Sequence, residues 1–279
     1  SRRRPPANPR CRAPRGACAQ ARAGLAAPWG GRFLGVVEMT ENGHQRYEQE
    51  VLAAPVISVA GGPLKQAEDI QIGLSVVYSA ESLARTLRRT FNVCQAALFG
   101  YGKVGRSIAR ELRCRNLHLE LVETDALRQV EALSHGFKLV NKAEALGRAE
   151  LVICCTGNGS LDIADLQALR PGAMLASVTS ADDEFAFCLS QLPWPSEEVC
   201  PHVLALTRPD GSTIFLLNRG EAVNFVHGAV IGEYVYLVLA EIIEGVHQLA
   251  GQAPAAGLLE LPQATMDCSG MNSCLPWKL

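Results

Sequence analysis

The chain has 279 residues, a formal net charge of −2 at pH 7 and 48% hydrophobic residues. A chain of this length and composition can bury a sizeable core, as one large domain or two small ones. The near-neutral charge gives no reason to expect nucleic acid or an anionic membrane as a partner, and no apolar run approaches the ~20 residues that span a bilayer.

The spacing of the ten cysteines does not indicate a disulfide framework. Cys154 and Cys155 are adjacent in an apolar run, and no Cys-x-x-Cys pair with zinc spacing occurs. We therefore expect free thiols in a reducing cytoplasm and no bound metal.

Residues 1–33 differ in composition from the rest of the chain. They contain eight arginines, no acidic residue and five prolines. Proline breaks helices, and the segment is too poor in large apolar residues to fold. We predict a disordered basic leader; a targeting peptide and a sequence from a misplaced start are the alternatives.

The globular part is predicted to begin with two short strands and a helix. The apolar runs Leu34–Val37 and Val56–Val59 are typical of strands, and Ala80–Arg89 has the spacing of an amphipathic helix. Between them, Lys65 and Asp69 are four residues apart, which on a helix is by itself typical of a solvated ion pair.

A dinucleotide-binding pattern follows. An apolar strand, Ala96–Phe99, enters Gly100-Tyr101-Gly102-Lys103-Val104-Gly105, helical spacing continues, and a second strand, Leu117–Val122, ends at Glu123. The first glycine permits the tight turn, the second lets a pyrophosphate approach the backbone, and the third lets the helix pack closely on the sheet. The backbone N–H groups of Lys103 and Val104 lie at the predicted helix N-terminus, which attracts the phosphates.

Glu123 stands 18 residues after Gly105, where a carboxylate accepts hydrogen bonds from the adenosine ribose. Its charge repels a 2′-phosphate, and no arginine follows before Arg128. We therefore predict NAD as the cofactor, in preference to NADP.

Further strands complete the predicted sheet. Leu151–Cys155 precedes a loop, Thr156-Gly157-Asn158-Gly159, and Ala173–Val178 is another apolar strand. Open α/β sheets bind ligands at such strand ends, so Thr156, Gly157 and Asn158 are candidate cofactor residues. A hairpin around Arg208–Gly211, an apolar helix over Ala229–Leu249 and an irregular tail after Gly251 are predicted to follow. Together these elements predict an α/β protein with a Rossmann-type, doubly wound parallel sheet.

Several segments together resemble the S-adenosylhomocysteine hydrolase family. They are, in chain order, Gly35–Thr40, Pro55–Val59, Lys65–Asp69, the glycine motif, Glu123–Asp125, Thr156–Asn158 and Ile214–Asn224. The resemblance implies hydrolysis of S-adenosylhomocysteine, or a related nucleoside thioether, to adenosine and homocysteine. In the family, NAD takes hydride from the substrate 3′ carbon, a base removes the 4′ proton, the thiol leaves, water adds and the hydride returns.

The resemblance also implies roles for individual residues. Lys65 and Asp69 would address the ribose hydroxyls, with Lys65 as a base, and Thr40 would lie among the catalytic residues. Asn224 would contact the nicotinamide amide; an asparagine closing a turn is the alternative. A homo-oligomer with a small nucleoside substrate is implied as well.

The chain departs from the family pattern at several positions. Met39 replaces an acid, Ile70 replaces an asparagine, and a histidine is missing near Ser180. Another histidine is missing unless His227 takes its place, and the C-terminal Lys and Tyr of the family have no clear match. Most of the amino-terminal substrate domain has no counterpart.

We expect four parts: the leader at 1–33, a partial substrate domain or hinge at 34–92, an NAD-binding domain at 93–225, and a C-terminal helix and tail at 226–279. Two functions remain open. One is an NAD-dependent hydrolase, active or altered in substrate. The other is a non-catalytic NAD-binding homologue, or a truncated product, that acts as a binding or partner subunit.

Overall fold

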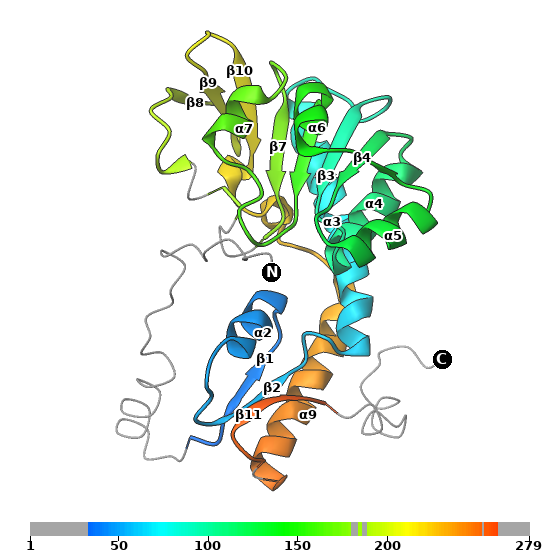
Figure 1. Cartoon of the computed structure of the whole chain (residues 1–279), viewed down its shortest axis with the longest axis vertical. Coiled ribbons are helices and arrows are strands. Elements are labelled where there is room, and N and C mark those ends of the chain that lie inside the picture. Colours follow the sequence, from blue (N-terminus) through cyan, green and yellow to red (C-terminus); the bar gives the residue numbers. More distant parts are fainter. Residues whose placement is uncertain (1–32, 180–183, 186–188, 253, 262–279) are drawn as a thin grey trace, which may run out of the picture. The chain divides into compact units, whose positions relative to one another are not determined.

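The computed structural model describes residues 33–179, 184–185, 189–252 and 254–261 (Figure 1). The predicted basic leader thus lies almost entirely outside the described residues. The chain divides into two compact units, one of residues 66–235 and the other of residues 1–65 with 236–279. The larger unit begins at Gln66, whereas the predicted NAD-binding domain begins at residue 93, because helix residues that precede the glycine motif pack with the sheet.

The larger unit contains an eight-stranded sheet in the order β5-β4-β3-β6-β7-β10-β9-β8. The strands are β3 (Gln95–Phe99), β4 (His118–Val122), β5 (Lys138–Leu139), β6 (Leu151–Cys154), β7 (Met174–Ser177), β8 (Ser196–Cys200), β9 (Val203–Thr207) and β10 (Thr213–Leu217). The first six in spatial order are parallel, and β9 and β8 continue the sheet antiparallel. The predicted Rossmann-type sheet is confirmed, because the six parallel strands have the 3-2-1-4-5-6 order.

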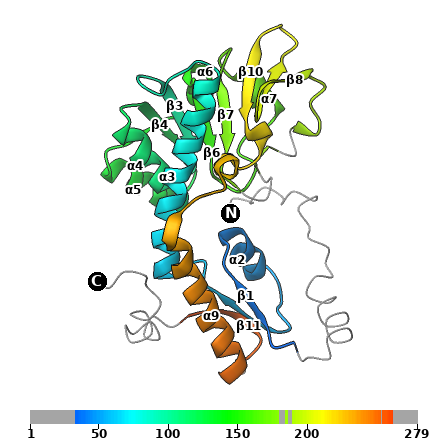
Figure 2. The ribbon, with the colours of Figure 1, turned by 180° about the vertical axis from the view of Figure 1, so that it is seen from behind.

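Helices cover both faces of this sheet (Figure 2). They are α3 (Pro63–Thr86), α4 (Lys103–Cys114), α5 (Ala126–Ser134), α6 (Lys142–Arg148) and α7 (Ile163–Ala168). Successive residues of β3 point to opposite faces, so Ala96 and Leu98 join the core under α3, α4 and α5, while Ala97 and Phe99 join the core under α6 and α7.

Helix α3 begins well before the predicted start at Ala80. It packs tightly on α4, and this is possible because Gly73 has no side chain. A Cβ at this position would collide with Ser107 Oγ and lie 2.9 Å from the Ile108 nitrogen. The Ser107 hydroxyl donates to the Ile70 carbonyl at 2.7 Å. The sequence pattern missed the first part of this helix, residues 63–79, because α3 is buried on more than one side and lacks a clean polar face.

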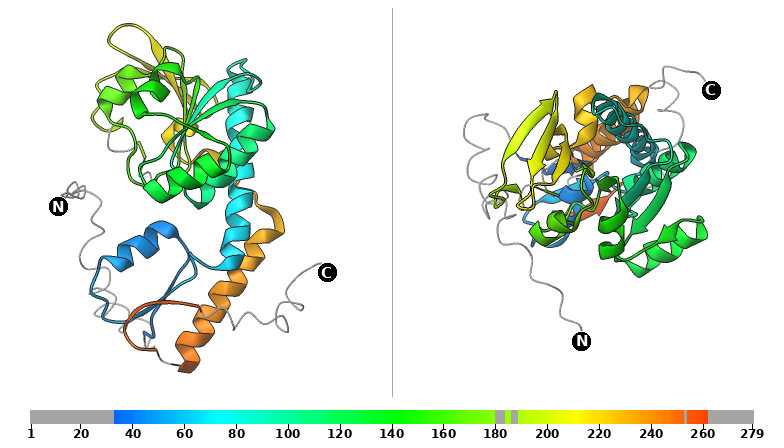
Figure 3. Two further views of the ribbon diagram at one scale, coloured as in Figure 1. Left: turned by 45° about the vertical axis from the view of Figure 1, so that its right-hand side comes forward. Right: turned by 90° about the horizontal axis from the view of Figure 1, so that it is seen from above.

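The smaller unit contains a parallel three-stranded sheet in the order β1-β2-β11. Its elements are β1 (Val36–Glu38), β2 (Pro55–Ser58), β11 (Gly257–Glu260), α2 (Glu41–Glu48) and most of α9 (Val235–Gln252). Figure 3 shows β11 in red. The predicted irregular tail after Gly251 is therefore wrong at 257–260, where the chain completes the sheet by pairing with β2.

Short 3₁₀ turns follow β10: η1 (Asn218–Gly220), η2 (Val223–His227) and η3 (Gly232–Tyr234). No helix in the described part of the chain is long and apolar enough to cross a membrane. Nor do the described residues include three His, Cys, Asp or Glu side chains grouped to hold a metal ion.

Candidate cofactor site

The glycine turn between β3 and α4 has the geometry that a dinucleotide requires. Gly100 has a φ of +96°, a conformation that L side chains rarely adopt. A Cβ at Gly105 would collide with the Gly100 carbonyl oxygen and lie 3.1 Å from Cys155 Sγ. A Cβ at Gly102 would meet only the Arg128 Nη1, at 3.8 Å. The first and third glycines are thus required by the fold, while the second leaves open space for a ligand.

The N-terminus of α4 is open to an anion. Gly102 is its N-cap residue, and no side chain caps this end. The first backbone hydrogen bond of the helix is donated by the Arg106 N–H to the Gly102 carbonyl at 2.9 Å. The backbone N–H groups at this end of the helix precede the first helical bond, and contacts of Lys103 and Val104 with a phosphate stay a prediction.

Glu123 ties the glycine turn to the end of β4. Its Oε2 accepts from the Tyr101 N–H at 2.7 Å, and its Oε1 accepts from the N–H groups of Thr124 at 2.7 Å and Asp125 at 2.9 Å. A carboxylate has about four lone-pair sites, so Oε2 keeps capacity for a ribose hydroxyl. Its contact with ribose stays a prediction.

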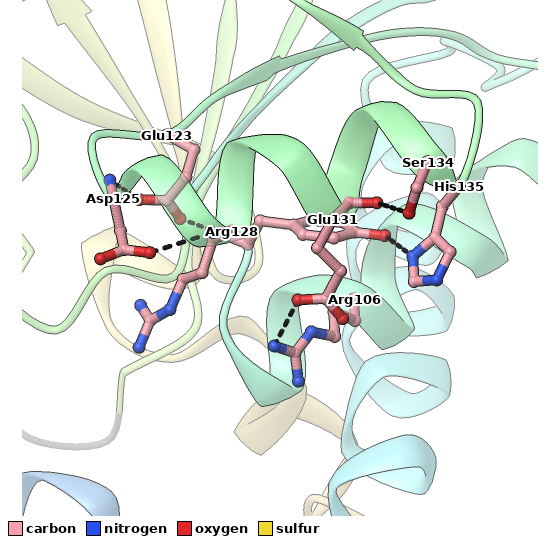
Figure 4. Close-up of polar contacts among 8 residues, drawn as sticks. Arg106, Glu123, Asp125, Arg128, Glu131, Ser134 and His135 are labelled. Atoms are coloured by element: carbon pink, nitrogen blue, oxygen red, sulfur yellow. Dashed lines mark hydrogen bonds and ion pairs between the residues drawn. The ribbon is translucent and has the colours of Figure 1, made fainter.

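The other side chains of the turn brace α4 against α5 (Figure 4). Tyr101 is buried, and its hydroxyl lies 2.8 Å from Nδ1 of His135. Arg106 on α4 pairs with Glu131 on α5 at 2.7 Å. These two contacts join the turn and α4 to α5.

A second polar loop follows β6, which neighbours β3 in the sheet. Thr156, Gly157 and Ser160 of this loop all donate to one carboxylate, that of Glu184. The Gly157 N–H lies 2.7 Å from Glu184 Oε1, and the Ser160 hydroxyl lies 2.8 Å from Oε2. Asn158 instead turns back on its own loop, with Nδ2 donating to the Thr156 carbonyl at 3.0 Å.

Glu184, which holds the loop after β6, was not among the residues predicted from the sequence. It is only 2% exposed, yet it closes an acidic run, Asp182-Asp183-Glu184, that reads as a solvated segment. Its position six residues beyond the predicted strand Ala173–Val178, at the same edge of the sheet, was the available signal.

The thiols beside this loop are structural. Cys154 is buried and Cys155 is half-buried, and burial raises the pKa of each thiol well above its ordinary value, with the Glu184 charge adding to the effect. A thiol with a raised pKa is a poor nucleophile at neutral pH.

Asn224 lies on η2, after the last parallel strand. It is 6% exposed, and its Oδ1 is buried without a hydrogen-bond partner among the described residues. An unpaired buried acceptor costs about 1–3 kcal/mol, so this oxygen indicates a donor that a ligand would supply. A carboxamide N–H of nicotinamide fits this requirement, and the contact that the family resemblance implies stays a prediction.

His227, considered as a replacement for a family histidine, packs against α3. Its Nδ1 lies 3.0 Å from Ser79 Oγ, its Nε2 lies 3.4 Å from Ser82 Oγ, and its ring contacts Tyr78 edge-on. Both ring nitrogens are thus engaged within the protein.

Lys65 and Asp69 both lie on α3, four residues apart. Lys65 is 8% exposed and Asp69 is 6% exposed, so they are not the solvated pair that the spacing alone suggested. Asp69 lines a hollow of about 250 Å³ together with Lys103 and Arg106 of α4.

Thr40 caps α2. Its Oγ1 accepts from the Gly43 N–H at 3.0 Å and donates to Glu38 Oε1 at 2.7 Å. The structure therefore gives this hydroxyl a local structural role, and its catalytic role stays a prediction.

The sheet order and the glycine turn define a Rossmann-type dinucleotide-binding protein. The chain belongs to the S-adenosyl-L-homocysteine hydrolase family, whose NAD binding domain is matched by residues 76–230. The cofactor is NAD. The open space at Gly102, the uncapped end of α4 and the unpaired oxygen of Asn224 all fit it.

Relatives of known identity agree with this family. The adenosylhomocysteinase of Thermotoga maritima is 30% identical over 204 residues, which cover 70% of this chain and 49% of that enzyme. The adenosylhomocysteinase of Corynebacterium diphtheriae is 28% identical over 201 residues, covering 68% of this chain and 41% of that enzyme. The chain thus spans about half the length of the curated relatives it matches. Among solved structures, the A chain of dipicolinate synthase from Bacillus subtilis is similar, with a TM-score of 0.46 and 11% identity over 75% of this chain and 70% of that one.

The start of α3 depends on a buried carboxylate from α9. Glu241 is 1% exposed and accepts from the backbone N–H groups of Leu64 at 3.1 Å and Lys65 at 3.2 Å. Burial raises its pKa above the ordinary value of 4.5, although these two N–H bonds and the Lys65 charge oppose the shift. A carboxyl group whose pKa is raised on folding stabilises the protein fully below its unfolded pKa, and this contribution is lost as pH rises through the folded pKa.

We therefore expect Glu241→Gln to gain stability relative to the wild type as pH rises above about 4.5. The measurement is the melting temperature of both proteins across the acid-to-neutral range. Glu233→Gln, at an exposed position just before α9, is the control and should show a constant difference. A difference between wild type and Glu241→Gln that stays constant with pH would contradict the raised pKa.

Proposed function

We propose that this chain is an NAD-dependent, adenosylhomocysteinase-like hydrolase that acts on S-adenosylhomocysteine or a related nucleoside thioether. The observation that carries the proposal is the buried Asp69, which lines one hollow with Lys103, the residue directly after Gly102 of the cofactor turn. A generic dinucleotide-binding fold does not require a buried acid there. The family relationship supports a substrate role for that acid.

Each proposed catalytic residue has a distinct task. Asp69 accepts hydrogen bonds from ribose hydroxyls, Lys65 removes a proton, and Thr40 is the third catalytic residue that the family resemblance implies. Bound NAD supplies reversible hydride acceptance from the 3′ carbon.

The second candidate is a non-catalytic NAD-binding subunit. Met39 and Ile70, where the family resemblance implies polar groups, and the use of the Thr40 hydroxyl as a helix cap favour it. The position near Ser180 lies outside the described residues. In either case we propose a cytoplasmic homo-oligomer, as the family resemblance implies.

Oxidation of adenosine separates the two candidates, because it needs only the cofactor, a positioned carbinol and a base. Wild-type protein mixed with NAD and adenosine should produce the absorbance of reduced nicotinamide, at a rate below the ~10 s⁻¹ typical of enzymes. Lys65→Ala should lower this rate by ~10²-fold or more, the usual contribution of a general base.

His118→Ala is the control, because this side chain is exposed on β4 and has no proposed role. It should keep the wild-type rate. An equal rate in Lys65→Ala would exclude Lys65 as the base, and no signal from NAD-loaded wild-type protein would favour the non-catalytic subunit.

A further inference from the structure

Arg128 is an exposed arginine at the start of α5, three residues after Asp125. Its backbone N–H donates to the Asp125 carboxylate at 2.9 Å. Its guanidinium forms no hydrogen bond or ion pair within the described part of the chain, and no dashed line reaches it in Figure 4. The neighbouring Arg106 differs, because its guanidinium forms an ion pair with Glu131.

The guanidinium of Arg128 lies over the second glycine of the turn. The point where a Cβ of Gly102 would stand is 3.8 Å from Nη1 of Arg128, and no other atom beyond the adjoining residues lies within 4 Å of that point. In this fold, the missing Cβ of the second glycine is what lets the pyrophosphate touch the backbone. A phosphate at this turn would face the helix N-terminus, and the exposed Arg128 side chain lies within reach of that place.

The local charges favour an anion at this position. The Glu123 carboxylate, the nearest acid of the predicted ribose site, already accepts three backbone N–H groups from Tyr101, Thr124 and Asp125. The Asp125 carboxylate caps α5. The Arg128 guanidinium beside the turn has no hydrogen bond or ion pair with the described residues, and a guanidinium matches phosphate oxygens with two parallel N–H donors.

We infer that Arg128 binds the diphosphate of the dinucleotide and is a further binding residue of the cofactor site. The sequence analysis used Arg128 only as the end of an arginine-free stretch after Glu123, in the argument for NAD over NADP. The first turn of α5 instead carries it back over Gly102. The inference concerns the bound cofactor alone and does not depend on the proposed hydrolysis.

Calorimetric titration with NAD, NADP and ADP tests this role without any turnover. Arg128→Ala should weaken binding of all three ligands by a similar factor of about tenfold or more, the value of hydrogen bonds to a charged group. Arg128→Lys should fall between the wild type and Arg128→Ala, because it keeps the charge but loses the paired donors.

Arg110→Ala is the matched control. Arg110 is an exposed arginine on α4, and its loss changes the net charge equally without removing a group over Gly102. Its affinities should stay within about twofold of the wild type. Unchanged NAD and ADP affinity in Arg128→Ala would overturn the inference. So would a loss confined to NADP, which would place Arg128 at the 2′-phosphate instead.

Discussion

Replacing Gly102 with valine is expected to abolish NAD binding while the protein stays folded. Gly102 has a φ of −74°, which valine adopts without strain, and a Cβ there would have no neighbour closer than 3.8 Å. The added methyl groups would occupy the space of the pyrophosphate. We expect a loss of at least ~100-fold in affinity, or about 2.7 kcal/mol, measured by calorimetric titration with NAD.

Gly105→Ala provides the comparison. Its Cβ would collide with the Gly100 carbonyl oxygen, so this variant should lose thermal stability as well as affinity. Gly102→Val should melt within a few degrees of the wild type. If Gly102→Val bound NAD as tightly as the wild type, the pyrophosphate would not lie against this turn.

Removing the Glu184 carboxylate is expected to produce the largest loss of stability in the cofactor-binding unit. Glu184→Ala would leave the backbone N–H groups of Gly157 and Ser160 and the Thr156 hydroxyl without their buried acceptor. Each unsatisfied buried donor costs about 1–3 kcal/mol. Because neighbouring losses do not simply add, we expect a decrease of about 3–5 kcal/mol in the free energy of unfolding, measured with urea.

Two further variants separate loss of the charge from loss of the acceptor. Glu184→Gln keeps one carbonyl oxygen but turns an NH₂ group toward donors, so its loss should be smaller than that of Glu184→Ala but still exceed 1 kcal/mol. Glu197→Gln makes the same chemical change on the exposed strand β8 and should stay within about 0.5 kcal/mol of the wild type. Equal stabilities of Glu184→Gln and Glu197→Gln would show that the loop does not depend on the carboxylate.

The sequence by itself determined the cofactor half of this protein. The turn from Gly100 to Gly105 and the acid at Glu123 are local features, each set by the sterics or charge of one residue at a fixed spacing. Short apolar strands such as those around Leu98 and Ile153 were equally readable, because buried parallel strands form continuous apolar runs.

Tertiary structure alone decided which distant groups complete the site. Glu184 stands in an acidic run that suggests solvent, yet the fold buries it beneath the loop after β6. Arg128 returns over Gly102 only because α5 begins immediately beyond Glu123, and β11 exists only because β2 offers it an edge. These contacts join residues far apart in the chain or depend on how a helix is oriented, and neither spacing nor hydrophobic periodicity records such information.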